Sequence, residues 1–185
     1  GFNGFSQLAM GTFNDVTAIS KIAVNTHLAG AAGTVTGAVL SRLLGGKTDV
    51  IMMLNGALAG LVAITAEPLT PTPGFAILIG SIGSVIMYFG TKMLENFGLD
   101  DVVGAIPVHM FAGIFGTLIV PLTNKGVAFS SQFVGTLSVC AFSFVLSYII
   151  FKTMKATIGL RISKEAEKLG TDKAEVGVVA YAIRD

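Results

Sequence analysis

The feature that most constrains this chain is the run Val102–Leu122, in which His109 is the only ionisable side chain. A helix rises ~1.5 Å per residue, so this run can cross the ~30 Å hydrocarbon core of a bilayer. An ionisable group at that depth is costly unless it faces a bundle interior or a pore. Pro107 lies two residues earlier, and it frees backbone groups that a neighbouring helix or pore water must satisfy. His109 is therefore a candidate functional residue.

The composition identifies an integral membrane protein. Of the 185 residues, 52% are hydrophobic and only 12% are charged, whereas a soluble domain carries about 25% charged residues. The 23 glycines are typical of tightly packed membrane helices. The net charge of +1 gives no indication of a nucleic-acid partner. Cys140, the single cysteine, excludes an internal disulfide and is interpreted as a packing residue.

Hydrophobicity predicts an all-α bundle of five membrane spans, with a lipid bilayer as its surroundings. The spans run roughly over 17–41, 50–67, 74–94, 102–122 and 129–152. A stub, 1–11, precedes them, so the transmembrane domain is 1–152. The polar tail, 153–185, alternates its charges, and its segment 164–173 is interpreted as a solvated helix.

Basic residues predict the orientation of these spans. Ten of the twelve lysines and arginines fall in 42–49, in 92–101 and from residue 152 onward, all on one side of the membrane. Lys21 and Lys125 are the two exceptions. The positive-inside rule therefore predicts a cytoplasmic C-terminus. We expect a multi-pass protein of the inner (plasma) membrane.

Small residues recur at helical spacing, as in Gly33/Gly37 and Gly56/Gly60, which predicts close helix packing. None of the glycine-rich runs continues into a phosphate-binding GK[ST] sequence. No nucleophile–base constellation and no metal-ligand cluster stands out in the sequence. We therefore expect no enzyme activity, no cofactor and no metal.

The N-terminus lies inside an apolar stretch without a methionine or a basic n-region, so it does not resemble a signal peptide. We expect the sequence to be a piece of a longer protein that begins inside a helix.

Four segments in register resemble the ammonium transporter (Amt/Mep/Rh) family. They are GFNGFS at 1–6, LNGALAGLVAITA at 54–66, the Asp100-Asp101 pair followed by VH and GIFG up to 116, and IGLR with KEAE at 158–167. The resemblance implies the family fold of eleven transmembrane helices with an inverted repeat. This chain would cover the C-terminal half, from the sixth-helix stub through the eleventh helix. The tail at 171–177 is similar to the marine bacterial branch.

The resemblance also implies site residues. His109 matches the second of the family's paired pore histidines, Phe2 matches a phenyl ring of the outer gate, and Ser6 matches the hydroxyl of the outer recruitment site. Phe5 is an alternative to Phe2, and packing is the alternative role for both rings. His27 does not fall at a pore-histidine position, so we expect it to bond a helix neighbour or to lie at a subunit contact.

Asp100 and Asp101 precede a helix, where carboxylates cap free N–H groups, and we expect that structural role. The family often carries another acid at the position of Gly104.

The function that the resemblance implies is passage of ammonium or ammonia through a hydrophobic pore with a histidine-lined track. The alternative is an ammonium sensor that uses the same site. A sensor needs a downstream output domain, and we do not expect one after Asp185. A cation pump or a helix-packing subunit is the generic alternative, and it leaves the four segments unexplained. The resemblance further implies a homotrimer, and a PII-type regulator at the tail, although the family's tail motif with a histidine is not found here.

The predicted orientation can be tested by cysteine labelling in intact cells. With Cys140 replaced by Ser, an impermeant thiol reagent should label Thr72→Cys, because the 68–74 loop is extracellular in this topology. Thr171→Cys should react only after the cells are permeabilised. The reverse pattern would invert the topology.

Overall fold

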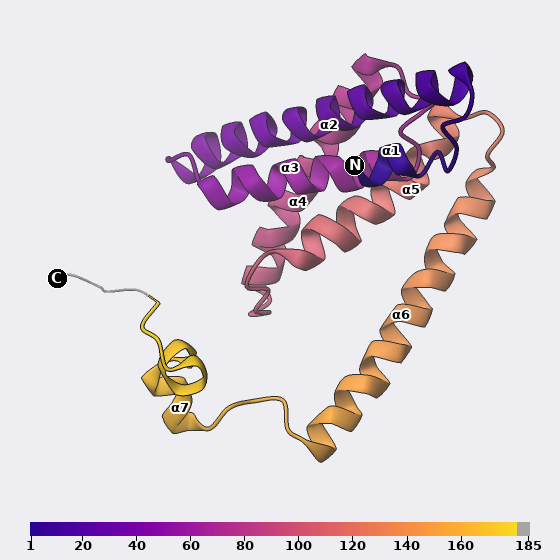
Figure 1. Cartoon of the computed structure of the whole chain (residues 1–185). Helices are drawn as coiled ribbons and strands as arrows, with labels where there is room; N and C mark the ends of the chain where they lie inside the picture. The colour runs from indigo at the N-terminus through magenta and orange to yellow at the C-terminus, as the bar shows by residue number, and fades with distance from the viewer. Residues whose placement is uncertain (181–185) are drawn as a thin grey trace. The chain divides into compact units, whose positions relative to one another are not determined.

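The computed structural model describes residues 1–180, and this part of the chain is helical without a strand (Figure 1). The predicted all-α class is therefore confirmed. The elements are α1 (Phe2–Phe5), α2 (Phe13–Gly45), α3 (Val50–Thr65), α4 (Pro73–Asn96), the π-helical turn η1 (Ile106–Phe111), α5 (Ala112–Thr123), α6 (Phe129–Thr157), α7 (Lys164–Leu169) and a second π-helical turn, η2 (Asp172–Val176). The chain forms two compact units, which divide within α6 after Leu137.

Among the described residues, four helical segments are long and apolar enough to cross a membrane. They are α2, α4, η1 with α5, and α6. The remaining expected span, 50–67, contains α3, which has 16 residues. At ~1.5 Å per residue α3 is ~24 Å long, shorter than the ~30 Å hydrocarbon core.

Local signals in the sequence explain where the first long helices begin and end. Thr12 and Asp15 form a capping box, so α2 starts at Phe13, earlier than the expected residue 17. Gly46 ends α2 in the left-handed conformation, with φ of 78°. The Asp49 carboxylate then accepts hydrogen bonds from the N–H groups of Ile51 and Met52, at 2.8 and 3.2 Å, and starts α3.

Helices α2, α3 and α4 pack side by side, and backbone approaches backbone where they meet (Figure 1). A Cβ added at Gly33 of α2 would overlap the carbonyl oxygen of Gly56 in α3, and one added at Gly56 would overlap that of Gly33. Additions at Gly60 or Gly80 would overlap the backbone of Ala29. The close packing predicted from the spaced glycines is thus confirmed.

Side-chain hydrogen bonds attach the loop between α3 and α4 to its surroundings. Asn25 of α2 is fully buried, and its Nδ2 donates to the carbonyl oxygens of Pro68 and Pro71, both at 2.9 Å. The Glu67 carboxylate accepts a hydrogen bond from Asn124 Nδ2 at 3.0 Å, which joins this loop to the end of α5. The loop is therefore anchored to two helices.

The second unit contains the tail. Ser163 caps α7, since its Oγ accepts from the Ala166 N–H at 3.1 Å. The solvated helix expected over 164–173 is correct only as far as Leu169, because Gly170 takes a φ of 96°. Beyond it, the backbone N–H of Ala180 donates to the Asp172 carboxylate, and this bond holds the pKa of Asp172 below its usual value.

The glycine packing predicts a position-specific cost. Gly33→Ala should lower the free energy of unfolding by about 1–3 kcal/mol, because the new methyl group forces α2 and α3 apart. Gly135→Ala in α6 is the matched control, since a Cβ there meets nothing within 4 Å. Thermal unfolding in detergent measures both, and equal midpoints for the two variants would contradict the packing argument.

Candidate functional site

His109 lies in η1, a single π-helical turn that leads directly into α5. Such turns are rare and often mark functional sites. The chain reaches η1 through Gly104, which takes a left-handed φ of 72°. Pro107 then supplies no N–H donor, which weakens the regular α-helical bonding pattern at this point.

Asp101 caps the start of this turn. Its two carboxylate oxygens accept the backbone N–H groups of Ala105 at 2.9 Å and of Ile106 at 2.8 Å. The capping role predicted for the acidic pair is confirmed for Asp101. The carboxylate therefore holds the first residues of η1 in place.

The imidazole of His109 lies on the exposed side of η1, away from the interior of the helix bundle. Its neighbours Pro107 and Val108 are buried, with Val108 only 1% exposed, whereas His109 itself is exposed. The ring of Phe111 lies against Gly90 of α4, where a Cβ would overlap it. The same turn thus anchors apolar side chains in the core and presents the one ionisable group outward.

Phe2 begins α1, a short helix that packs on α2, and Ser6 is the C-cap of that helix. Both side chains are exposed, and Ser6 Oγ donates to the Phe2 carbonyl oxygen one turn earlier, at 3.0 Å. Phe5 is also exposed, so exposure does not distinguish it from Phe2. The element that carries His109 packs instead on α3, α4 and α5, so different helices position the two groups.

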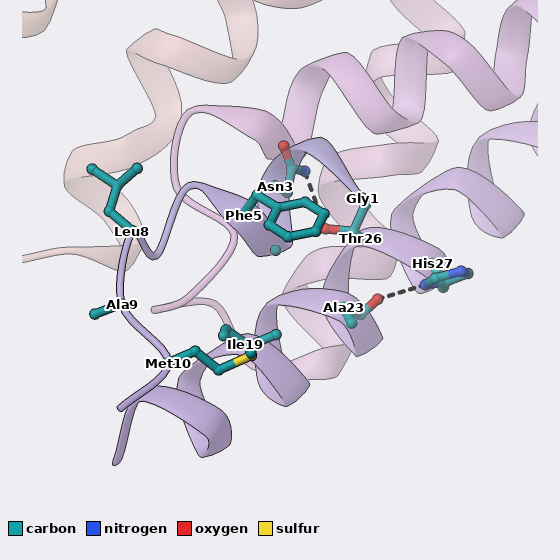
Figure 2. Close-up of a pocket in the computed structure, with 11 residues that line it drawn as sticks. Gly1, Asn3, Phe5, Leu8, Ala9, Met10, Ile19, Ala23, Thr26 and His27 are labelled. Carbon is teal, nitrogen blue, oxygen red and sulfur yellow. Dashed lines mark hydrogen bonds between the residues drawn. The ribbon is translucent and has the colours of Figure 1, made fainter. Parts of the chain in front are cut away.

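Sequence reasoning missed Asn3, the residue that attaches α1. Asn3 is buried, and its Nδ2 donates to Thr26 Oγ1 of α2 at 3.1 Å (Figure 2). The sequence signal that could have identified Asn3 is a polar residue within an apolar stretch.

An apolar groove of about 500 Å³ lies between α1, the connector that follows it and the first half of α2 (Figure 2). Phe5, Leu8, Met10 and Ile19 form much of its lining, and His27 lies at its edge. A ring nitrogen of His27, Nδ1, lies 2.7 Å from the Ala23 carbonyl oxygen of the same helix. His27 therefore bonds within its own helix, and its place at a subunit contact stays a prediction.

These features define a polytopic helical membrane protein with one exposed imidazole in an uncharged span. The family model described as Ammonium Transporter Family matches residues 1–181. The chain therefore belongs to the ammonium transporter family, whose members are transport proteins and not enzymes.

Curated relatives agree with this assignment. The chain is 39% identical to the ammonium transporter Amt2 of Archaeoglobus fulgidus, over 98% of this chain and 42% of the relative. It is 38% identical to a putative ammonium transporter of Synechocystis, over 96% of this chain and 41% of the relative. The chain thus spans about two-fifths of the length of these proteins.

Solved structures show the same fold. A structure described as a Sensor Amt Protein is similar with a TM-score of 0.85 and 31% identity, over 94% of this chain and 45% of that one. Mep2 of Saccharomyces cerevisiae gives a TM-score of 0.77 at 22% identity, over 95% and 43% of the two chains. The Amt-type helical bundle predicted from the sequence is therefore confirmed.

The cap at Asp101 predicts a stability difference between two adjacent carboxylates. Asp101→Ala should lower the free energy of unfolding by about 1–2 kcal/mol, because two N–H groups lose their acceptor. Asp100→Ala, at the exposed neighbour, should change it by less than about 0.5 kcal/mol. Thermal unfolding in detergent compares the two, and a larger loss at Asp100 would refute the capping assignment.

Proposed function

We propose that this chain contributes to a pathway that carries ammonium or ammonia across the membrane, with His109 in its lining. The observation that carries the proposal is the exposed imidazole, held outward by a π-helical turn within an otherwise uncharged span. The family membership supports the substrate, because the relatives are named ammonium transporters.

An imidazole suits this substrate chemically. One ring nitrogen of a neutral histidine donates a hydrogen bond and the other accepts one, so the ring can bind NH3 or relay a proton. The rest of the span offers apolar side chains, which cannot replace the hydration shell of K⁺ or Na⁺. A polar track in an apolar passage therefore favours ammonia over hydrated metal cations.

Ser6 is the proposed hydroxyl of the outer recruitment site, and Phe2 is a proposed ring of the outer gate. Ser6 donates its hydroxyl hydrogen to the Phe2 carbonyl oxygen, so the lone pairs of Oγ can accept from an ammonium N–H. An exposed phenyl ring beside it attracts a cation through its negative face. The pair therefore suits NH4⁺, an ion that can only donate hydrogen bonds.

We extend the proposal to the oligomeric state, the membrane and the orientation of the protein. The protein acts as a homotrimer in the inner (plasma) membrane, with its C-terminal tail in the cytoplasm and accessible to a PII-type regulator. The basic asymmetry of the loops supports this orientation.

A sensor is the second candidate, because one similar solved structure is described as a Sensor Amt Protein. In a sensor, ammonium would bind the same residues without net flux. Uptake of radiolabelled methylammonium into cells that express the whole gene product separates the two. Binding without uptake would support the sensor.

The pore role of His109 predicts opposite results for the two histidines. In the whole gene product, His109→Ala should reduce selective ammonium conduction at least tenfold or remove its discrimination against K⁺, because the passage loses its polar group. His27→Ala should leave conduction largely intact, since His27 bonds its own helix. Ammonium-elicited current in proteoliposomes measures both variants.

Trimer content must be equal in the compared preparations, and we expect both variants to fold because Gly33 and Gly56, which pack α2 on α3, are untouched. If His27→Ala abolishes conduction while His109→Ala behaves as the parent, the assignment of the pore histidine is wrong.

A further inference from the structure

Both ends of the segment that carries His109 are held against one helix, α3. At the upstream end, Asn55 Nδ2 donates to the Val103 carbonyl oxygen at 3.0 Å. At the downstream end, Gly116 lies so close to the Ala63 backbone that a Cβ would overlap the Ala63 carbonyl oxygen. The residues between these two attachments must adopt a helical form that connects the two fixed points on α3.

Asn55 and Gly104 fit together at the upstream attachment. Asn55 is buried in α3, and its amide occupies the space next to Gly104. A Cβ added at Gly104 would lie 2.7 Å from Asn55 Nδ2. Any side chain at residue 104 would therefore push the amide away from the Val103 carbonyl group.

The π-helical turn between the attachments sets the direction of the imidazole. Such a turn accommodates one residue more than an α-helix does, and one residue corresponds to a rotation of about 100° about the helix axis. In the observed turn Val108 is buried and His109 is exposed. Relaxation to an α-helix would rotate His109 away from its present direction and expose Val108 in its place.

We propose that Asn55 and Gly104 are a matched pair of positioning residues that set the direction of His109 by holding the π-helical turn. Neither residue needs to touch the substrate. The consequence for conduction rests on the proposed function of His109, whereas the consequence for the orientation of the turn does not. The experiment therefore measures orientation and conduction separately.

The orientation is measured by cysteine accessibility in the whole gene product, with all native cysteines, including Cys140, replaced by Ser. Val108→Cys and His109→Cys are compared for their rates of reaction with a small methanethiosulfonate reagent. In the parent background Cys at 109 should react at least tenfold faster than Cys at 108. Gly104→Ala should lower this ratio at least fivefold, because the turn relaxes.

Conduction is measured as a double-mutant cycle with Asn55→Ala, Gly104→Ala and the double variant. Gly104→Ala alone should reduce ammonium conduction about tenfold, through the collision with the amide and through the strain of alanine at a φ of 72°. Once Asn55→Ala has removed the amide, the collision is relieved and only the backbone strain at residue 104 remains. The double variant should therefore conduct at least threefold better than the product of the two single losses, without a change in trimer content.

Gly113→Ala in α5 is the matched control, since a Cβ there lies 3.5 Å from Val62 Cγ1, an ordinary contact. It should leave both the labelling ratio and conduction unchanged. Gly104→Asn tests the collision with a side chain that tolerates the left-handed conformation, should Gly104→Ala fail to accumulate.

Multiplicative losses in the cycle together with an unchanged 109-to-108 labelling ratio would overturn the proposal. If the ratio falls as expected but His109→Ala conducts like the parent, the proposed function fails and the positioning role stands. If His109→Ala fails to conduct and the ratio does not move, the function stands and the positioning role is wrong.

Discussion

The packing of α2, α3 and α4 in the first unit depends on glycines, which have no side chain and therefore let the helix backbones touch. In a membrane there is little hydrophobic drive for helices to associate, so association depends on close van der Waals contact and on weak Cα–H···O bonds. Gly33 and Gly56 face each other with no room for a Cβ on either one, and Gly80 lies on Ala29 in the same way. These contacts bring α2, α3 and α4 together.

Helix α3 is the shared support of this arrangement. It packs on α2 and α4, and η1 and α5 also pack on it. Although it is shorter than the four segments that could cross a membrane, it supplies both Asn55 and Ala63 to the segment around His109. The direction of one imidazole therefore depends on a helix whose own sequence suggests only packing.

The sequence predicted those parts of the fold that hydropathy and capping chemistry encode locally. The apolar runs gave helices, the glycine spacing gave close packing, and Asp101 proved to be a cap. The π-helical turn was not predicted, because composition does not record the pairing of backbone N–H and carbonyl groups. Asn55 was missed since its partner lies 48 residues away in the chain. The roles of Phe2, Ser6 and His109 came from the family resemblance and stay predictions.

The buried Asn25 shows how finely one loop depends on the identity of a single atom. Both of its partners are carbonyl oxygens, so its Nδ2 must face them. An aspartate would have nearly the same size and shape, but it would set an oxygen against two oxygens and turn two attractions into repulsions. Spontaneous loss of ammonia from this amide would therefore release the loop at 68–71, although the molecule would hardly change in volume. The stability of this region depends on nitrogen at one position, and packing complementarity alone cannot replace it.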